Sequence, residues 1–144
     1  MIFDKAPEDF KPASEVVACL IECGEQILLL KRKDKNQYWA QPAGGKDHGE
    51  TLIQAVLREV LEETGLMMDE KKVAFIKTFF VRYPHKDFSF SVFRYTLARK
   101  PKIRLCEEHS EHLWTTPAQA LLLNLIPDED ICLKEIYSLA GYQD

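Results

Sequence analysis

The segment Gly44–Leu66 reads GGKDHGETLIQAVLREVLEETGL and joins a glycine-rich stretch to an amphipathic helix pattern. Apolar side chains recur in it at helical spacing, at Leu52, Ile53, Val56, Leu57, Val60 and Leu61. Thr51 and Gln54 form a capping-box pattern at the start of this repeat, and Gly65 is a typical helix stop. The segment therefore predicts a helix over about 52–64 that packs its apolar face on a core.

Three carboxylates of this helix, those of Glu59, Glu62 and Glu63, fall on one arc beside the apolar face, because positions i, i+3 and i+4 lie together. Like charges at this spacing repel each other, which favours a bound cation. Oxygen ligands at this density suit Mg²⁺ or Mn²⁺ better than zinc. Arg58 lies next to the arc and is expected to pair with Glu50 or with a member of the cluster. Glutamates on a helix are more often simply solvated, so the cluster alone does not decide the function.

The pattern outside this segment predicts two hairpins, several loops and two more helices. Strands are expected over 15–21, 26–32, 73–82, 88–98 and 113–114, glycine-rich and charged loops over 43–49 and 100–110, and helices from 116–117 and from 127–128 to 139. Strands first, one helix in the middle and helices last predict an α+β fold. We expect it to be layered as an α/β/α sandwich, with a mixed β-sheet flanked by helices.

Length and composition limit the classes of protein. A chain of 144 residues fits one domain over 1–144, with residues 1–12 as a short N-terminal extension. The 46% of hydrophobic residues argues for a globular protein, and the net charge of −4 argues against an extended nucleic-acid partner. No apolar run approaches the roughly 18 residues of a membrane span, and residues 1–12 lack the apolar core of a secretory signal. The four cysteines match no zinc framework, so a cytoplasmic protein without a membrane partner is expected.

The complete set of spacings resembles a Nudix box. Gly44, Glu50, Arg58-Glu59-Val60, Glu62-Glu63 and Gly65-Leu66 all stand at the separations of that motif. The chain therefore resembles the Nudix hydrolase family in its small, single-domain, MutT-like form. The resemblance implies the Nudix α/β/α sandwich and metal-dependent hydrolysis of a diphosphate linkage in a nucleoside triphosphate or a related nucleoside diphosphate derivative. The products would be a nucleoside monophosphate and pyrophosphate or a phosphorylated group.

The same resemblance implies a role for each residue of the box. Glu62 and Glu63 would be ligands of Mg²⁺ or Mn²⁺, and Glu59 would be a further ligand or the general base. Arg58 would orient the glutamates, and the backbone carbonyl of Ala43 would also bind metal. The positions with a structural role would be Gly44, Glu50 (alternatively an outer metal ligand) and Gly65.

A second acidic element follows the box. Glu108-His109, four residues before Trp114, resembles an element found in several Nudix groups, diadenosine tetraphosphate hydrolases among them. Glu108 is therefore the favoured second base or metal ligand, and Glu107 and Glu111 are the alternatives. His109 is either a substrate contact or a bystander in the loop.

Weaker candidates for substrate contacts lie at strand ends. Lys31, Arg32 and Arg82 offer cations for phosphate, and Tyr83 offers a ring on which a base can stack. A solvated charge at a strand end, or for Tyr83 a packed aromatic side chain, is the favoured alternative explanation for each of them. The expected partner is a small nucleotide, bound by a monomer or a homodimer.

The class of substrate stays open. A dinucleoside polyphosphate hydrolase is favoured by the Glu108–Trp114 element, but the loop Pro42–Lys46 reads P-A-G-G-K where those enzymes usually carry a P-K-G-H-type loop. The P-A-G triplet mildly favours an ADP-ribose or nucleotide-sugar pyrophosphatase. A hydrolase of RNA 5′ ends has the acidic balance of the chain against it. A non-catalytic nucleotide-binding regulator with a Nudix fold would often lack box glutamates, and here none is missing.

Overall fold

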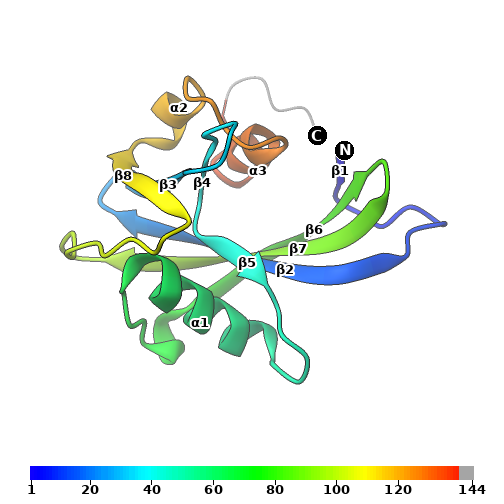
Figure 1. The fold of residues 1–144 in the computed structure, drawn as a ribbon, viewed down its shortest axis with the longest axis horizontal. Coiled ribbons are helices and arrows are strands. Elements are labelled where there is room, and N and C mark those ends of the chain that lie inside the picture. Colours follow the sequence, from blue (N-terminus) through cyan, green and yellow to red (C-terminus); the bar gives the residue numbers. More distant parts are fainter. Residues whose placement is uncertain (140–144) are drawn as a thin grey trace.

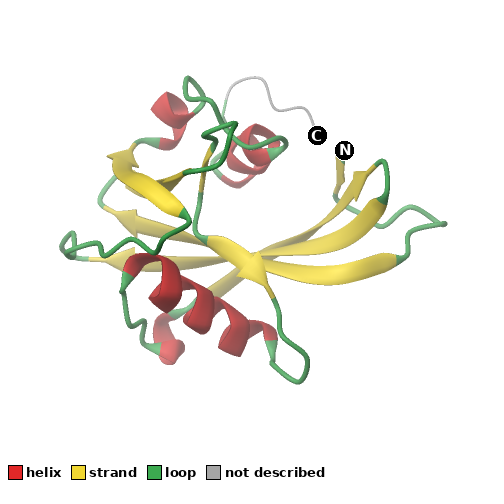
Figure 2. Ribbon diagram, in the orientation of Figure 1, coloured by secondary structure: helices red, strands yellow, loops and turns green. Residues whose placement is uncertain are grey.

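Residues 1–139, which the computed structural model describes, form a mixed β-sheet flanked by helices (Figures 1 and 2). The strands are β1 (Ile2–Phe3), β2 (Pro12–Cys23), β3 (Gln26–Arg32), β4 (Trp39–Ala40), β5 (Ala43–Gly45), β6 (Ala74–Tyr83), β7 (Lys86–Leu97) and β8 (His109–Thr115). The helices are α1 (Leu52–Thr64), α2 (Pro117–Ala120) and α3 (Glu129–Ile136), with a 3₁₀ turn, η1, at Glu70–Lys72. This arrangement confirms the predicted α+β class.

The sheet is organised around β2. The strand order is β1-β6-β7-β2-β3-β4, and β2 runs parallel to β7 while its other neighbours are antiparallel. Strand β3 pairs with β2 only at Glu22 and Cys23, and it then continues in partnership with β8. Where β3 has separated from β2, strand β5 pairs with the same edge of β2, at Val16, Val17 and Ala18. The sheet therefore divides at β2, and β5 lies at this division.

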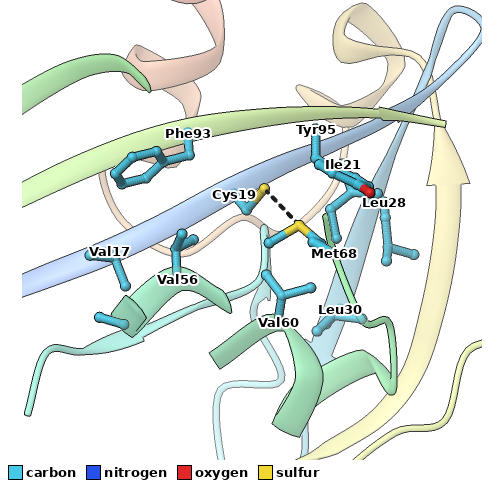
Figure 3. Close-up of a cluster of buried hydrophobic side chains, with 11 residues drawn as sticks. Val17, Cys19, Ile21, Leu28, Leu30, Val56, Val60, Met68, Phe93 and Tyr95 are labelled. Carbon is cyan, nitrogen blue, oxygen red and sulfur yellow. Dashed lines mark hydrogen bonds between the residues drawn. The ribbon is translucent and has the colours of Figure 1, made fainter. Parts of the chain in front are cut away.

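Two cores lie on opposite faces of the sheet. Val17, Cys19 and Ile21 of β2 pack with Val56 and Val60 of α1 (Figure 3). Alternate residues point the other way, because side chains of a strand alternate between its faces. On that second face the buried cluster joins strands to α2 and α3, and its members include Leu20, Leu29, Val92, Ala120, Cys132 and Leu133. Helix α1 therefore covers one face, and α2 and α3 cover the other (Figure 1).

The strongest predictions from the sequence are confirmed. Helix α1 has the predicted bounds, and both predicted hairpins, β2–β3 and β6–β7, are present. The strands of each hairpin differ from the prediction by only a few residues at their ends, apart from the longer start of β2. Strand ends depend on which neighbour is available for pairing, and this is a tertiary property that the local pattern does not contain.

Four local predictions are wrong. Ala43–Gly45 forms strand β5 instead of a loop, because β2 offers it an unpaired edge. Strand β8 spans His109–Thr115 instead of two residues, because it pairs with nearly all of β3. Helix α3 ends at Ile136, and Ser138 just beyond it has a positive φ of 52° that a helix does not continue through. Ile2 and Phe3 form β1 against β6, so this part of the predicted extension belongs to the sheet.

Candidate active site

Helix α1 carries the box carboxylates and is fixed firmly at both ends. Thr51 accepts a hydrogen bond from the Gln54 backbone and the Gln54 side chain accepts one from Thr51, which completes the predicted capping box. Gly65 ends the helix at φ 77°, and its N–H donates to the Leu61 carbonyl. The helix therefore holds its side chains in a defined register against β5.

Arg58 joins the start of the box to its carboxylates. Its Nε and Nη2 donate to the two oxygens of Glu50 at 2.8 and 2.9 Å. Nη1 donates to Glu59 at 2.7 Å, and Nη2 also donates to the Gly45 carbonyl at 3.0 Å. Hydrogen bonds from Arg58 and from the Asp47 backbone lower the pKa of Glu50 to about 2. Arg58 thus pairs with both Glu50 and Glu59, while its orienting role stays a prediction, and Glu50 is held outside the cavity described below.

Glu59 lies directly on the backbone of β5. A β-carbon placed on Gly44 would be 2.1 Å from the carboxyl carbon of Glu59 and 2.2 Å from one of its oxygens. No side chain larger than a hydrogen atom fits between strand and carboxylate. Gly44 is therefore required by close packing.

Glu63 is buried between α1 and β5. Only 6% of its surface is exposed, and its Oε1 accepts a hydrogen bond from the Ala43 N–H at 3.1 Å. Burial raises the pKa of Glu63 to about 8, and the neighbouring carboxylates of Glu59 and Glu108 act in the same direction. Burial also raises the pKa of Glu59, against the opposing effect of Arg58. The raised pKa values mean that the two carboxyl groups resist ionising together unless a cation is present.

The backbone of Ala43 faces the same site. The Cys19 N–H donates to the Pro42 carbonyl and the Lys46 N–H donates to the Glu15 carbonyl. In the antiparallel register this makes Ala43 a non-hydrogen-bonded partner of Ala18, so both its N–H and its carbonyl point away from β2. The carbonyl is therefore on the side of Glu63, as the metal-ligand role from the resemblance requires.

The donors at this site suit a hard divalent cation, although they are not gathered into a finished cluster. Within residues 1–139, no three side chains of His, Cys, Asp or Glu converge closely enough to hold a metal ion. The third box carboxylate, that of Glu62, lies 3.5 Å from Arg58, and its side chain is 56% exposed. The half-buried Glu59 carboxylate, the buried Glu63 carboxylate and the Ala43 carbonyl still offer oxygens of the type that Mg²⁺ and Mn²⁺ prefer.

A cavity of about 760 Å³ adjoins these groups and passes from α1 to the start of α3. Its volume falls in the range that holds small ligands. The sequence-predicted residues that line it are Ala43, Gly44, Glu59, Glu62, Glu63, Arg32, Tyr83, Glu107, Glu108 and His109. The fold thus brings the box and the downstream acidic element to one space. Glu107 and Glu108 are both exposed there, while His109 is half-buried beside the Cys106 thiol at 3.5 Å.

Two predicted substrate contacts are not part of the cavity lining. Lys31 lies 3.0 Å from Glu111, and this ion pair occupies both. Arg82 donates to both oxygens of Asp87 at 2.8 and 2.9 Å and is also paired with Asp9. These cations are balanced by acids of the same hairpin or neighbouring strand, which the sequence pattern alone does not reveal.

Several lining residues were missed from the sequence. Gln41, Asp128 and Glu129 line the far end of the cavity together with Phe90. Asp128 and Glu129 follow Pro127, and the sequence predicts only the start of a helix there. A buried Gln41 next to Pro42 has no recognisable local pattern in the sequence, so its place in the cavity lining follows from the fold alone.

Among residues 1–139 no helix has the length and apolar character needed to cross a membrane.

Comparisons with known proteins agree with this geometry. The family model described as NUDIX domain matches residues 11–136. An RNA pyrophosphohydrolase of Wolbachia pipientis subsp. Culex pipiens is 53% identical over 47 residues, which cover 33% of this chain and 28% of that protein. In the first curated relatives the matched stretch spans only about a quarter of their length.

Solved structures show the same fold over most of the chain. A MutT NUDIX hydrolase from Burkholderia pseudomallei superposes with a TM-score of 0.75 at 22% identity, covering 88% of this chain and 98% of that one. An Ap4A hydrolase from C. elegans has a TM-score of 0.74 at 22% identity, covering 90% of this chain and 100% of that one. The family match over most of the chain and the shared fold show that this chain belongs to the Nudix domain family.

Proposed function

We propose that the protein is a divalent-metal-dependent pyrophosphohydrolase. Its substrate would be a nucleoside triphosphate or a related nucleoside diphosphate derivative, and one product would be a nucleoside monophosphate. The observation that carries the proposal is the pair of half-buried Glu59 and buried Glu63 against the backbone of β5, at one end of a nucleotide-sized cavity. An anionic diphosphate would be repelled by this pair unless a cation were bound there as well.

Glu59, Glu63 and the Ala43 carbonyl would hold the metal ion, which would neutralise the diphosphate and lower the pKa of the attacking water. Glu62 and Glu108 are exposed carboxylates on the same cavity and would reach the ion by side-chain rotation. Arg58 fixes Glu59 but does not line the cavity, so it is a positioning residue. Glu108 is free of ion pairs among the described residues, whereas Glu59 is held by Arg58. Glu108 is therefore a better candidate for the general base than Glu59.

The phosphate end of the substrate would lie near the loop before β8. Arg32 and His109 line the cavity there, and within residues 1–139 the exposed Arg32 is paired only with Asp34, at 3.2 Å. A guanidinium held by one exposed acid remains available to a phosphate. Lys31 and Arg82 are not included in this proposal, because both are engaged elsewhere.

A substrate panel tests the proposal. The purified protein is incubated with nucleoside triphosphates, oxidised triphosphates, dinucleoside polyphosphates, ADP-ribose and nucleotide sugars, each with Mg²⁺, Mn²⁺ or EDTA. Glu63→Gln should abolish cleavage, whereas Glu70→Gln, on the exposed 3₁₀ turn, should not. Metal-independent cleavage, or full activity of Glu63→Gln, contradicts the proposal. A folded protein that binds nucleotides and cleaves none of them is instead a binding module.

A second candidate function is removal of pyrophosphate from RNA 5′ ends. It is favoured by the names of several curated relatives, RNA pyrophosphohydrolases that match between 26% and 53% of this chain. Against it stands the net charge of −4. A 5′-triphosphorylated oligonucleotide in the same panel separates the two functions. An RNA enzyme should lose affinity steeply as salt rises, since it releases counterions, and a mononucleotide enzyme should lose much less.

A further inference from the structure

A tight turn before β8 brings a thiol and an imidazole together. The His109 N–H donates to the Cys106 carbonyl at 3.3 Å, so the chain reverses between these two residues. Their side chains meet as well, since the Cys106 sulfur lies 3.5 Å from Nδ1 of His109. The thiol is free, and both side chains are partly buried and line the cavity of about 760 Å³. The proposed hydrolysis gives this thiol no role, although it lines the space in which the substrate would bind.

The distance between these two atoms is the one that a tetrahedral zinc ion requires. Zinc binds a cysteine sulfur at about 2.3 Å and a histidine nitrogen at about 2.0–2.1 Å. At the tetrahedral angle of about 109°, these two bonds place sulfur and nitrogen about 3.5 Å apart. The separation of Cys106 Sγ and His109 Nδ1 is 3.5 Å. A zinc ion could therefore bind both atoms without a change in the distance between them.

The chemistry of the donors points to the same ion. A thiolate and an imidazole prefer zinc to Mg²⁺, which takes oxygen ligands.

The neighbours of the pair supply a further ligand. Glu107 and Glu108 follow Cys106 directly, are exposed and line the same cavity, so one carboxylate can reach the ion by side-chain rotation. Water would take the fourth position. Arg32 also lines this part of the cavity and its charge opposes a bound cation, but Asp34 at 3.2 Å partly neutralises it.

We propose that Cys106 and His109 bind Zn²⁺ at a second metal site, separate from the carboxylates of Glu59 and Glu63. As the zinc–sulfur bond forms, the thiol releases its proton to solvent, and Nδ1 of His109 supplies its lone pair. Zinc held here would draw Glu108 away from its proposed role as general base, so zinc should inhibit the hydrolysis. This inhibition rests on the proposed function, whereas the binding of zinc does not.

Titration with Co²⁺ tests the site, because Co²⁺ replaces zinc and shows a near-ultraviolet charge-transfer band when a thiolate binds it. The reduced protein is titrated in excess Mg²⁺, which occupies the oxygen ligands. The band should appear in wild type, and Zn²⁺ should remove it by displacing Co²⁺. Cys106→Ser should abolish the band, and His109→Gln should weaken Co²⁺ binding by at least about tenfold, since even the loss of a supporting contact costs about 10- to 100-fold.

Matched controls come from the same chain. Cys23→Ser and His112→Gln remove a partly buried thiol and an exposed imidazole that do not line the cavity, and both variants should keep the band and the affinity of wild type. Melting curves of each variant verify that it is folded.

The titration and the hydrolysis separate the two proposals. If the band appears but no substrate is cleaved, the zinc site stands and the proposed activity fails. If Mg²⁺-dependent cleavage occurs but folded wild type shows no band, the activity stands and the zinc site is wrong. A band that survives in Cys106→Ser, or that Mg²⁺ removes, also overturns the site. Where a substrate is cleaved, Cys106→Ser should need at least about tenfold more Zn²⁺ than wild type for half-inhibition, and equal inhibition of the two would contradict the effect on Glu108.

Discussion

A single missing side chain determines where the carboxylate of Glu59 can lie. Gly44→Ala would place a methyl group 2.1 Å from the Glu59 carboxyl carbon, so the carboxylate must leave β5. We expect kcat/KM to fall by about 10- to 100-fold, as when a supporting contact of a metal ligand is lost. Steady-state kinetics at saturating Mg²⁺ measure the change.

Gly45→Ala is the matched control for this substitution, because a β-carbon at Gly45 meets nothing within 4 Å. It should change kcat/KM far less than Gly44→Ala, and both variants should keep a melting temperature near that of wild type. Equal activity of the two variants would mean that Glu59 need not lie against β5.

Arg58 makes a second prediction at the residue scale. Its three nitrogens serve Glu50, Glu59 and the Gly45 carbonyl at once, and a lysine ammonium cannot reproduce this fork. Arg58→Lys should therefore lower kcat by roughly 10- to 100-fold, with a smaller effect on KM, since Arg58 does not line the cavity. Arg99→Lys, at an exposed position, is the control. An effect on KM alone would show that Arg58 touches the substrate.

At the scale of elements, the β6–β7 hairpin is stabilised by the ion pair between Arg82 and Asp87, in which the Asp87 side chain is 12% exposed. Asp87 accepts two hydrogen bonds from Arg82 and one from the Lys11 backbone, and together they lower its pKa to about 2. A lowered pKa contributes stability above the ordinary value of 3.8, and this contribution is lost as the pH falls toward 2. Urea unfolding should show that Asp87→Asn is less stable than wild type at pH 7, with a difference that shrinks between about pH 4 and 2.

Asp9→Asn is the comparison for this hairpin. Asp9 also contacts Arg82, but its side chain is 80% exposed, so its loss should matter much less. A difference between Asp87→Asn and wild type that stays constant down to pH 2 would contradict the pairing as the source of stability.

Elements could be predicted from sequence where the signal is local. Helix α1 has its periodicity, its cap and its stop within one stretch, and it was predicted to the residue. Strand β5 is three residues of Ala and Gly without any strand propensity, and it exists because β2 presents an open edge. The same holds for β8, whose length is set by β3.

At the scale of the whole molecule, the box carboxylates were predictable and the far end of the cavity was not. Glu59 and Glu63 belong to one helix, so their spacing in the sequence is their spacing in space. Gln41 and Glu129 are 88 positions apart and meet only when α3 packs against the segment before β5. Residues that are brought together only by tertiary packing have no characteristic separation in the sequence by which they could be recognised. Whether the chain acts as a monomer or a homodimer stays a prediction.

The last prediction concerns the stability of the whole fold. Burial, together with the neighbouring Glu59 and Glu108, raises the pKa of Glu63 to about 8, so without a cation this residue destabilises the fold at a pH above its ordinary value of 4.5. Glu63→Gln keeps an oxygen for the Ala43 N–H and removes the ionisable group that is costly to bury. In EDTA, the free energy of unfolding of this variant should exceed that of wild type by roughly 1 kcal/mol, which raises the melting temperature by about 4 °C.

Mg²⁺ should reverse this order. A cation that binds only the folded state stabilises it by about 2.7 kcal/mol at a free concentration of 100 times its Kd. Wild type should therefore gain melting temperature with Mg²⁺, while Glu63→Gln, which lacks a ligand, should gain little. Glu70→Gln is the control and should respond as wild type does. If Glu63→Gln melts below wild type in EDTA and both gain equally from Mg²⁺, then Glu63 is a structural residue and the cation binds elsewhere. A carboxylate site that binds a cation should lower the free energy of unfolding in the absence of metal and raise it when the metal is bound.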